Sequence, residues 1–226
     1  MIKRLSRRQI AWRIAQDIKE GMYVNLGIGQ PELVANYVKD NREVIFHSEN
    51  GILGMGPEPS ANDTDFDLIN AGKKPVTLLA GGSFFHHADS FAMIRGSHID
   101  ISVLGAFQVS ENGDLANWST GDVGAIPAVG GAMDLAVGSR RVFVMTDHNA
   151  KGGEPKLVEK CTYPLTASGV VNTVYSDLAV IDITSQGFCV REKIEGLTFS
   201  ELQDLTGARL LGKNMCKEFF APEMEC

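Results

Sequence analysis

The stretch HSENGILGMGP, residues 47–57, places a single carboxylate, Glu49, among apolar residues and glycines. A glutamate in this setting could act as a general base, a metal ligand or a nucleophile. The glycines that follow it, Gly51, Gly54 and Gly56, let the backbone come close to a bulky ligand. A polar, exposed glutamate at the end of a strand is the plainer interpretation of the same residues, and local context alone favours it.

Two other patterns suggest chemistry but lack a required residue. GIGQPE supplies Gly27 and Gly29 of a dinucleotide-binding fingerprint, but Glu32 stands in place of the third glycine, where its carboxylate would repel a pyrophosphate. Ser48 and Ser83 are not flanked by the G-x-S-x-G turn of a serine hydrolase. We therefore expect neither nicotinamide or flavin binding nor a serine nucleophile.

Metal-ligand patterns are also incomplete. The acidic run NDTDFD resembles the start of an EF-hand loop, but Leu68 and Lys74 occupy the positions that require glycine and glutamate. His86 and His87 are adjacent, so on a strand they would point to opposite faces. The four cysteines are scattered, with no CxxC pair. We expect no metal and no permanently bound cofactor, and a reducing cytoplasm as the compartment.

Length, composition and charge limit the class of protein. The chain has 226 residues, 44% of them hydrophobic, which fits one globular domain with a substantial core. A formal net charge of −7 opposes nucleic-acid binding, because that role rests on an excess of Lys and Arg. Residues 1–20 predict an amphipathic helix that ends near Gly21, with Ile10, Ile14 and Ile18 on one face. No apolar run is long enough to predict a membrane span.

Short apolar runs alternate with helical patterns along the chain. Each predicted strand is rich in Val, Ile, Leu or Phe and ends at Gly, Asp or Ser. The strands are expected within residues 22–29, 44–48, 75–82, 99–107, 140–147 and 178–184, with a helix from Pro31. Continuous apolar runs indicate strands that are covered on both faces, so we predict a layered single α/β domain on a largely parallel or mixed sheet. Glu49 would then lie at the carboxyl end of a strand, where open α/β sheets place their sites.

Several blocks together resemble a known family. SENGILGMGP resembles the SENG signature of the β subunits of the family I coenzyme A transferases, the 3-oxoacid CoA-transferases. Similar blocks follow in the family's order: DLINAGK from Asp67, SFAMIRGSHID from Ser90, LGAFQVSENGDLANW from Leu104 and VGGAMDLAVGSRRV from Val129. The resemblance implies a CoA-transferase domain of the NagB/RpiA-like type over residues 1–211 and a C-terminal tail over residues 212–226, whose role the sequence does not indicate.

The resemblance implies a role for Glu49. In the family the glutamate of SENG is the nucleophile, which attacks an acyl-CoA thioester and later carries CoA as a glutamyl thioester. Ser48 and Asn50 would then orient the carboxylate, and Gly51 and Gly54 would leave room for the substrate. Coenzyme A enters this scheme as a substrate rather than as a bound cofactor.

Two further sets of residues fit the same scheme. Gly130 and Gly131 of VGGAMDL are candidates to donate backbone N–H groups to an oxyanion, although paired glycines also mark an ordinary strand-to-helix turn. Ile52, Leu53 and Met55 could exclude water from the reactive intermediates, or could belong to the core. For each of these two sets, the sequence leaves both interpretations open.

The resemblance also implies a partner and a substrate class. The chain lacks the Gly-x-Gly-Gly-Phe block of the family's α half, so an α subunit is expected, in an αβ pair or its doubled form, α2β2. AGGSFFHHADSF and TGDVGAIPAVGGAMD are similar to the 3-oxoadipate-specific members, which favours succinyl-CoA and 3-oxoadipate, with His86 or His87 binding the second carboxylate. Transfer to acetoacetate, a noncatalytic metabolite-binding module and a thioester hydrolase are the alternatives.

Overall fold

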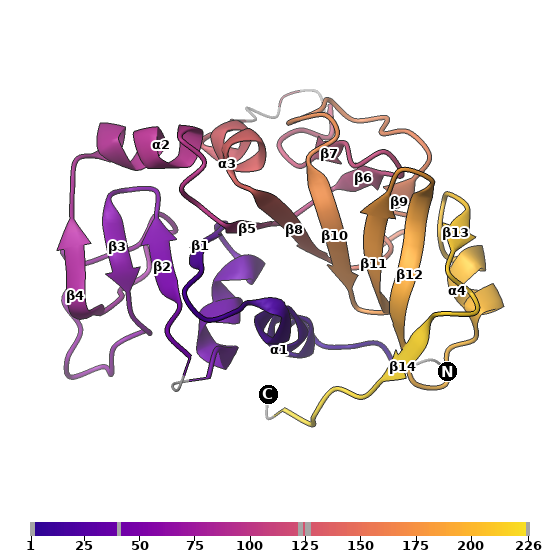
Figure 1. Cartoon of the computed structure of the whole chain (residues 1–226), viewed down its shortest axis with the longest axis horizontal. Helices are drawn as coiled ribbons and strands as arrows, with labels where there is room; N and C mark the ends of the chain where they lie inside the picture. Colours follow the sequence, from indigo (N-terminus) through magenta and orange to yellow (C-terminus); the bar gives the residue numbers. More distant parts are fainter. Residues whose placement is uncertain (1–2, 40–41, 122–123, 125–127, 225–226) are drawn as a thin grey trace.

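A mixed β-sheet forms the centre of the protein (Figure 1). The computed structural model describes residues 3–39, 42–121, 124 and 128–224. Within these residues the sheet has eleven strands. In spatial order they are β13 (Leu210–Leu211), β12 (Gly187–Ile194), β11 (Ala179–Thr184), β10 (Val171–Ser176), β8 (Arg141–Thr146), β5 (Ile101–Leu104), β1 (Tyr23–Leu26), β2 (Ile45–Ser48), β3 (Ile52–Met55) and β4 (Leu78–Phe84), with β14 (Lys217–Phe219) paired to β12.

The middle of the sheet is parallel and its flanks are antiparallel. Strands β10, β8, β5, β1 and β2 run in one direction, whereas β3 on one side and β11 on the other reverse it. The outer strand β4 is antiparallel to β3 and so runs in the direction of the central strands again. A second sheet of three strands is formed by β7 (Leu115–Ala116), β6 (Gln108–Ser110) and β9 (Leu157–Val158). The predicted α/β domain on a largely parallel or mixed sheet is confirmed.

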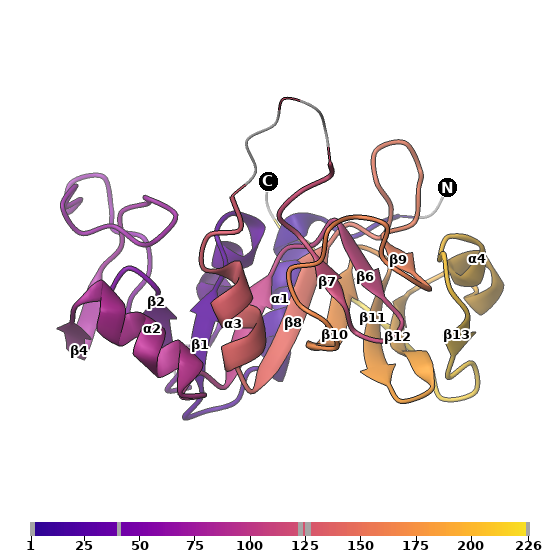
Figure 2. The same cartoon turned by 90° about the horizontal axis from the view of Figure 1, so that it is seen from above.

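Helices cover both faces of the large sheet. Side chains alternate along its strands, so a central strand such as β8 presents apolar residues to both faces. On β8, Val142 and Val144 pack in one apolar cluster with α2 (His87–Arg95) and α3 (Ala132–Gly138). Phe143 and Met145, between them, pack in the other cluster with α1 (Arg7–Asp17). Helices α2 and α3 lie side by side (Figures 1 and 2). The remaining helices in the described ranges are η1 (Gln30–Tyr37) and α4 (Phe199–Asp204).

Helix α1 follows the predicted amphipathic pattern. Ser6 accepts a hydrogen bond from the backbone N–H of Gln9, and the Gln9 side chain accepts one from the Ser6 N–H, so both halves of a capping box are present. Ile10 and Ile14 are buried, as predicted. The helix ends at Asp17, earlier than the expected end near Gly21, because the chain becomes extended at Ile18.

Local structure departs from the sequence pattern, or adds to it, at four places. The helix expected from Pro31 is the 3₁₀ helix η1, and the glycine-rich ILGMG segment after Glu49 contains strand β3. His86 and His87 do not lie on a strand: His86 caps α2 and His87 is its first residue. Within the 212–226 segment, β14 adds a parallel strand to β12 through the pairing of Glu192 with Lys217. Tertiary packing decides each of these, since short apolar runs are compatible with several local structures.

Candidate active site

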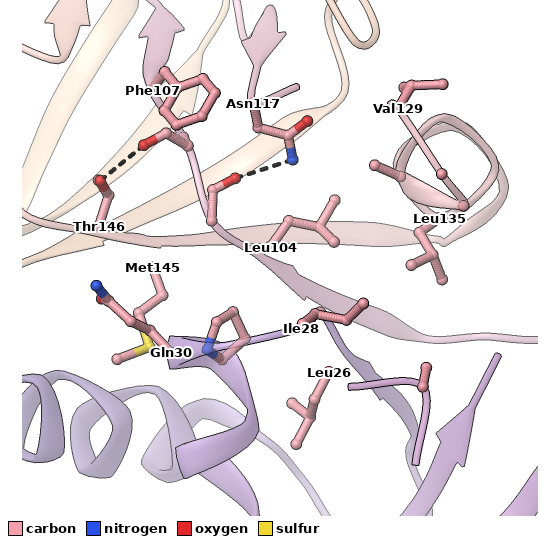
Figure 3. A pocket seen from close by; sticks show the side chains of 18 of the residues that line it. Leu26, Ile28, Gln30, Leu104, Phe107, Asn117, Val129, Leu135, Met145 and Thr146 are labelled. Atoms are coloured by element: carbon pink, nitrogen blue, oxygen red, sulfur yellow. Dashed lines mark hydrogen bonds between the residues drawn. The ribbon is translucent and has the colours of Figure 1, made fainter. Parts of the chain in front are cut away.

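A cavity of about 450 Å³ opens where four neighbouring parallel strands end. Strands β8, β5, β1 and β2 are adjacent and parallel, so their carboxyl ends meet at one edge of the sheet. The cavity is lined by residues that follow these strands together with the start of α3 (Figure 3). Apolar side chains dominate the wall; they include Leu26, Ile28, Leu104, Phe107, Val129, Leu135 and Met145. Glu49 also lines this cavity.

The turn between β2 and β3 presents Glu49. The Gly51 N–H donates to the Ser48 carbonyl at 2.9 Å, which closes a turn with Glu49 and Asn50 at its two central positions. Gly51 has a φ of 114°, and a Cβ there would lie 2.2 Å from the carbonyl oxygen of Phe85. Only glycine satisfies both conditions. The glycine of SENG therefore shapes the turn that exposes the carboxylate.

Ser48 and Asn50 fix this turn from both sides. The Ser48 Oγ accepts a hydrogen bond from the N–H of Ala71 at 3.0 Å. The Asn50 Nδ2 donates to the carbonyl of Ile69 at 2.8 Å. Both side chains thus bind the 69–71 segment, and they position Glu49 through the backbone on either side of it rather than through its carboxylate.

Burial raises the pKa of the Glu49 carboxyl, His87 lowers it and Asp134 raises it. His87 packs edge-on against Phe91, with 4.8 Å between the ring centroids. Asp134 pairs with Arg95 at 2.6 Å. Within the part of the chain that the structure describes, no side chain or backbone group donates a hydrogen bond to the Glu49 carboxylate. A carboxylate that is partly desolvated and unpaired is a stronger nucleophile and base than one in water.

The start of α3 lies against Glu49. A Cβ on Gly131 would lie 2.4 Å from the Glu49 Oε2 and 3.0 Å from the Phe91 ring. Gly131 is the N-cap residue of α3 with an ordinary φ of −79°, whereas Gly130 has a φ of +54°. Both glycines line the cavity. Close approach to the carboxylate, rather than backbone conformation, therefore favours a glycine at position 131, because a larger residue would displace the end of the Glu49 side chain.

A buried neutral histidine supports the site, a role that no sequence pattern indicated. His47 precedes Ser48 on β2 and is 1% exposed. Its Nδ1 accepts from the Asn25 Nδ2 at 2.9 Å, so the Nε2 carries the proton and donates to the Ser90 Oγ at 2.9 Å. Burial lowers the pKa of His47 to about 4. The hydrogen bond from neutral His47 to Ser90 thus connects β2 to α2 directly beside the turn that carries Glu49.

The structure brings together only part of the predicted site. Glu49, Gly130 and Gly131 line the cavity. Among the described residues, the lining does not include Ser48, Asn50, Gly51, Gly54, His86 or His87. Gly54 instead packs against Gly82 of β4, and the His86 Nδ1 accepts from the Ala88 N–H. The segment 120–134 that favoured 3-oxoadipate lies in part outside the described residues, at positions 122–123 and 125–127.

The residues expected to exclude water do not line the cavity. Ile52 and Met55 are buried in the core on the α1 side of the sheet, and Leu53 pairs with Ser83 of β4. The core interpretation therefore holds for Ile52 and Met55, while Leu53 is partly buried. The cavity wall comes from the ends of other strands, which are far from Glu49 in the sequence. Asn117, Thr146 and Lys156 are polar members of that wall that the sequence did not point to, because no local motif marks them.

The described ranges offer neither a metal site nor a membrane span. No group of three or more His, Cys, Asp or Glu side chains there could hold a metal ion. No helix in those ranges is long and apolar enough to cross a membrane. The cavity beside Glu49 is therefore the site that the geometry supports.

Comparison with known proteins defines the class. Residues 7–203 match the family model for coenzyme A transferase. The chain belongs to the coenzyme A transferase family, which confirms the resemblance found in its sequence blocks.

Individual relatives show which members of the family the chain is similar to. The chain is 63% identical to the β subunit of 3-oxoadipate CoA-transferase from Pseudomonas putida, over 92% of this chain and 98% of that protein. It is 48% identical to the β subunit of succinyl-CoA:3-ketoacid coenzyme A transferase from Helicobacter pylori, over 89% of this chain and 97% of that protein. The crystal structure of an acyl-CoA transferase from Escherichia coli O157:H7 shares the fold, with a TM-score of 0.76 at 16% identity, over 97% of this chain and 44% of that chain.

Proposed function

We propose that this chain is the β subunit of a CoA-transferase that moves CoA from succinyl-CoA to 3-oxoadipate, with Glu49 as the nucleophile. The observation that carries the proposal is the position of Glu49, which is unpaired among the described residues, against Gly131 in the wall of the cavity. The higher identity to the 3-oxoadipate relative than to the 3-ketoacid relative, 63% against 48%, supports the acceptor. Both relatives are named as one subunit of their enzyme, which supports an α subunit as partner.

The reaction proceeds through covalent exchange. The Glu49 carboxylate attacks the thioester carbon of succinyl-CoA, the C–S bond breaks, and an acyl-glutamyl anhydride and CoA thiolate form. The thiolate attacks the glutamyl carbonyl, releases succinate and leaves a glutamyl-CoA thioester. The carboxylate of 3-oxoadipate then repeats these two steps in reverse order, which yields 3-oxoadipyl-CoA and free Glu49. Each exchange trades one carboxylate for another, so no strong general base is needed.

The described residues around Glu49 suit these reaction steps. Each tetrahedral intermediate carries a negative oxygen, and the backbone N–H groups of Gly130 and Gly131 are candidates to stabilise it. Within the described residues, neither N–H donates a backbone hydrogen bond, so both are available. The apolar wall formed by Leu104 and Leu135 limits access of water to the anhydride and the thioester.

One experiment separates this function from its alternatives. The chain is co-produced with the protein encoded beside it, supplied with succinyl-CoA, and offered 3-oxoadipate, acetoacetate or no acceptor. Preferred transfer to 3-oxoadipate supports the proposal, whereas preferred transfer to acetoacetate would replace its acceptor. CoA release without an acceptor would indicate a hydrolase, and no turnover with any acid would favour a noncatalytic module.

The nucleophile is tested directly on the same assembly. Glu49→Ala should lower transfer by at least about 1,000-fold, as expected when a covalent nucleophile is lost. Incubation of the wild-type assembly with succinyl-CoA alone should add mass to the peptide that contains Glu49, and an acceptor acid should remove that mass. Retained transfer in the Ala variant would refute the covalent mechanism.

A further inference from the structure

Lys156 contributes a positive charge to the cavity that holds Glu49. It is the only Lys or Arg among the described residues that line this cavity. Its backbone is fixed, because its N–H donates to the His148 carbonyl at 3.1 Å and its carbonyl accepts from the Val109 N–H at 2.9 Å. The lysine therefore occupies a defined place just before β9.

The ammonium group is held in position but not neutralised. Its Nζ donates to the Thr146 Oγ1 at 3.0 Å, and that hydroxyl donates in turn to the Ala106 carbonyl at 3.1 Å. No described carboxylate lies within 4 Å of the Nζ, since Lys156 takes part in none of the ion pairs. Asp147 and Asp177 favour the charged form from further away, and Asp177 is already bound by Arg4 at 2.8 Å.

The charge is also partly removed from water. Burial lowers the pKa of Lys156, while Asp147 and Asp177 raise it. A half-buried ammonium with a single neutral hydrogen-bond acceptor has unused donors, and an anion that enters the cavity would satisfy them. An unpaired charge in such a place costs stability, so a ligand is its natural counterpart.

We propose that Lys156 binds the distal carboxylate of a dicarboxylic substrate while the other carboxyl end reacts at Glu49. The inference rests on the proposed function and assigns a contact that determines its specificity. Most residues that line the cavity are apolar, which suits the methylene segment of such an acid, whereas a 3-oxo acid without a second carboxylate has no group for Lys156. A phosphate of CoA is a less suitable partner, since Lys156 and Glu49 share one cavity of small-molecule size.

This assignment differs from the one suggested by the sequence, where His86 or His87 bound the second carboxylate. The His86 Nδ1 is engaged by the Ala88 N–H, and His87 acts on Glu49 itself. Replacement of His87 would then alter transfer to both kinds of acid alike. Replacement of Lys156 should distinguish between them.

The test compares two acceptors on the assembly with its α subunit. In a ping-pong reaction kcat/KM for the acceptor does not depend on the donor step, so 3-oxoadipate and acetoacetate can be compared directly. Lys156→Met should lower kcat/KM for 3-oxoadipate by about 10- to 100-fold, the range for a hydrogen bond to a charged group. The value for acetoacetate should change by less than about threefold, and Lys156→Arg should restore part of the loss.

A matched control and a binding measurement complete the test. Lys151→Met removes an exposed lysine from the same loop and should leave both values unchanged. In the inactive Glu49→Gln assembly, addition of Lys156→Met should weaken calorimetric binding of 3-oxoadipate by the same factor. Equal losses for both acids, or no loss for either, would overturn the inference. A wild-type assembly that transfers CoA to neither acid would instead overturn the proposed function.

Discussion

The Glu49 Oε2 lies so close to Gly131 that a Cβ at position 131 would be 2.4 Å from it. Two residues from distant parts of the chain thus lie so close that a methyl group at position 131 would displace the carboxylate. The turn after β2 supplies the carboxylate, and the start of α3 supplies the surface against which it rests. This contact gives the first prediction.

Gly131→Ala should displace the Glu49 carboxylate and lower kcat by about 100-fold, because a shift of about 1 Å in a reacting group has this effect. The fold should persist, since the φ of −79° suits alanine. Gly130→Ala is the contrasting variant. Its Cβ would meet no atom of the described residues within 4 Å, but the φ at this position is +54°, so this variant should lose about 1 kcal/mol of stability and keep most activity. Equal activity of the two variants would contradict the steric argument.

Gly51→Ala should disrupt the turn that presents Glu49. The new Cβ would lie 2.2 Å from the Phe85 carbonyl oxygen at a φ of 114°, so we expect a loss of about 2–4 kcal/mol and of transfer activity. Gly21→Ala isolates the cost of backbone conformation, because Gly21 has a φ of 77° and open space around it. Urea unfolding should show a loss of only about 1 kcal/mol for that control.

The pH dependence of transfer should report the ionisation of Glu49. The nucleophile must be ionised, so activity should rise with pH through the raised pKa of this carboxyl. His87 lowers that pKa and Asp134 raises it. His87→Gln should therefore move the acid limb of kcat/KM to higher pH, and Asp134→Asn should move it to lower pH. His98→Gln, at an exposed position, should not move it.

His148 should make stability depend on pH. It is fully buried between the hydroxyls of Ser176 and Thr206, and burial lowers its pKa to about 4. A base with a lowered folded-state pKa loses stability as pH falls from its unfolded value of 6.5 towards 4, because the unfolded chain binds the extra proton. The loss is at most about 3 kcal/mol by this linkage. His148→Gln should flatten the stability profile over this window in urea unfolding, apart from the contribution of His47.

The ion pairs of Arg13 should matter for folding. Arg13 makes two hydrogen bonds of 2.7 Å to Glu192 and one of 2.8 Å to Asp17, and its side chain is 11% exposed. Arg13→Met leaves both carboxylates without this partner and should cost about 3–5 kcal/mol. The side chains of the Lys3–Glu223 pair are 87% and 96% exposed, so Lys3→Met should change stability by less than about 1 kcal/mol. Similar losses in the two variants would contradict the role of burial.

The sequence by itself determined the layered α/β class and most central strands, and it singled out Glu49 as the carboxylate proposed to react. Continuous apolar runs signal strands that are covered on both faces, and this signal is local. Glu49 could be recognised because its turn residues, Ser48 to Gly51, are contiguous, and the blocks that follow carry the family resemblance. The role of Gly51 did not follow from the sequence, which suggested room for the substrate, whereas the structure shows the positive φ of a tight turn.

Only the tertiary structure decided which groups surround Glu49 and share its cavity. Gly131 lies against its carboxylate, His87 acts on its pKa, and Lys156 lines the same cavity. They come from the start of α3, from α2 and from the segment before β9, and no spacing in the chain predicts that these segments converge. Their roles depend on burial and distance, which set the pKa of Glu49 and leave one ammonium without a carboxylate. Parallel strands bring their carboxyl ends together only after distant segments have paired, so the cavity and its charges are properties of the folded sheet.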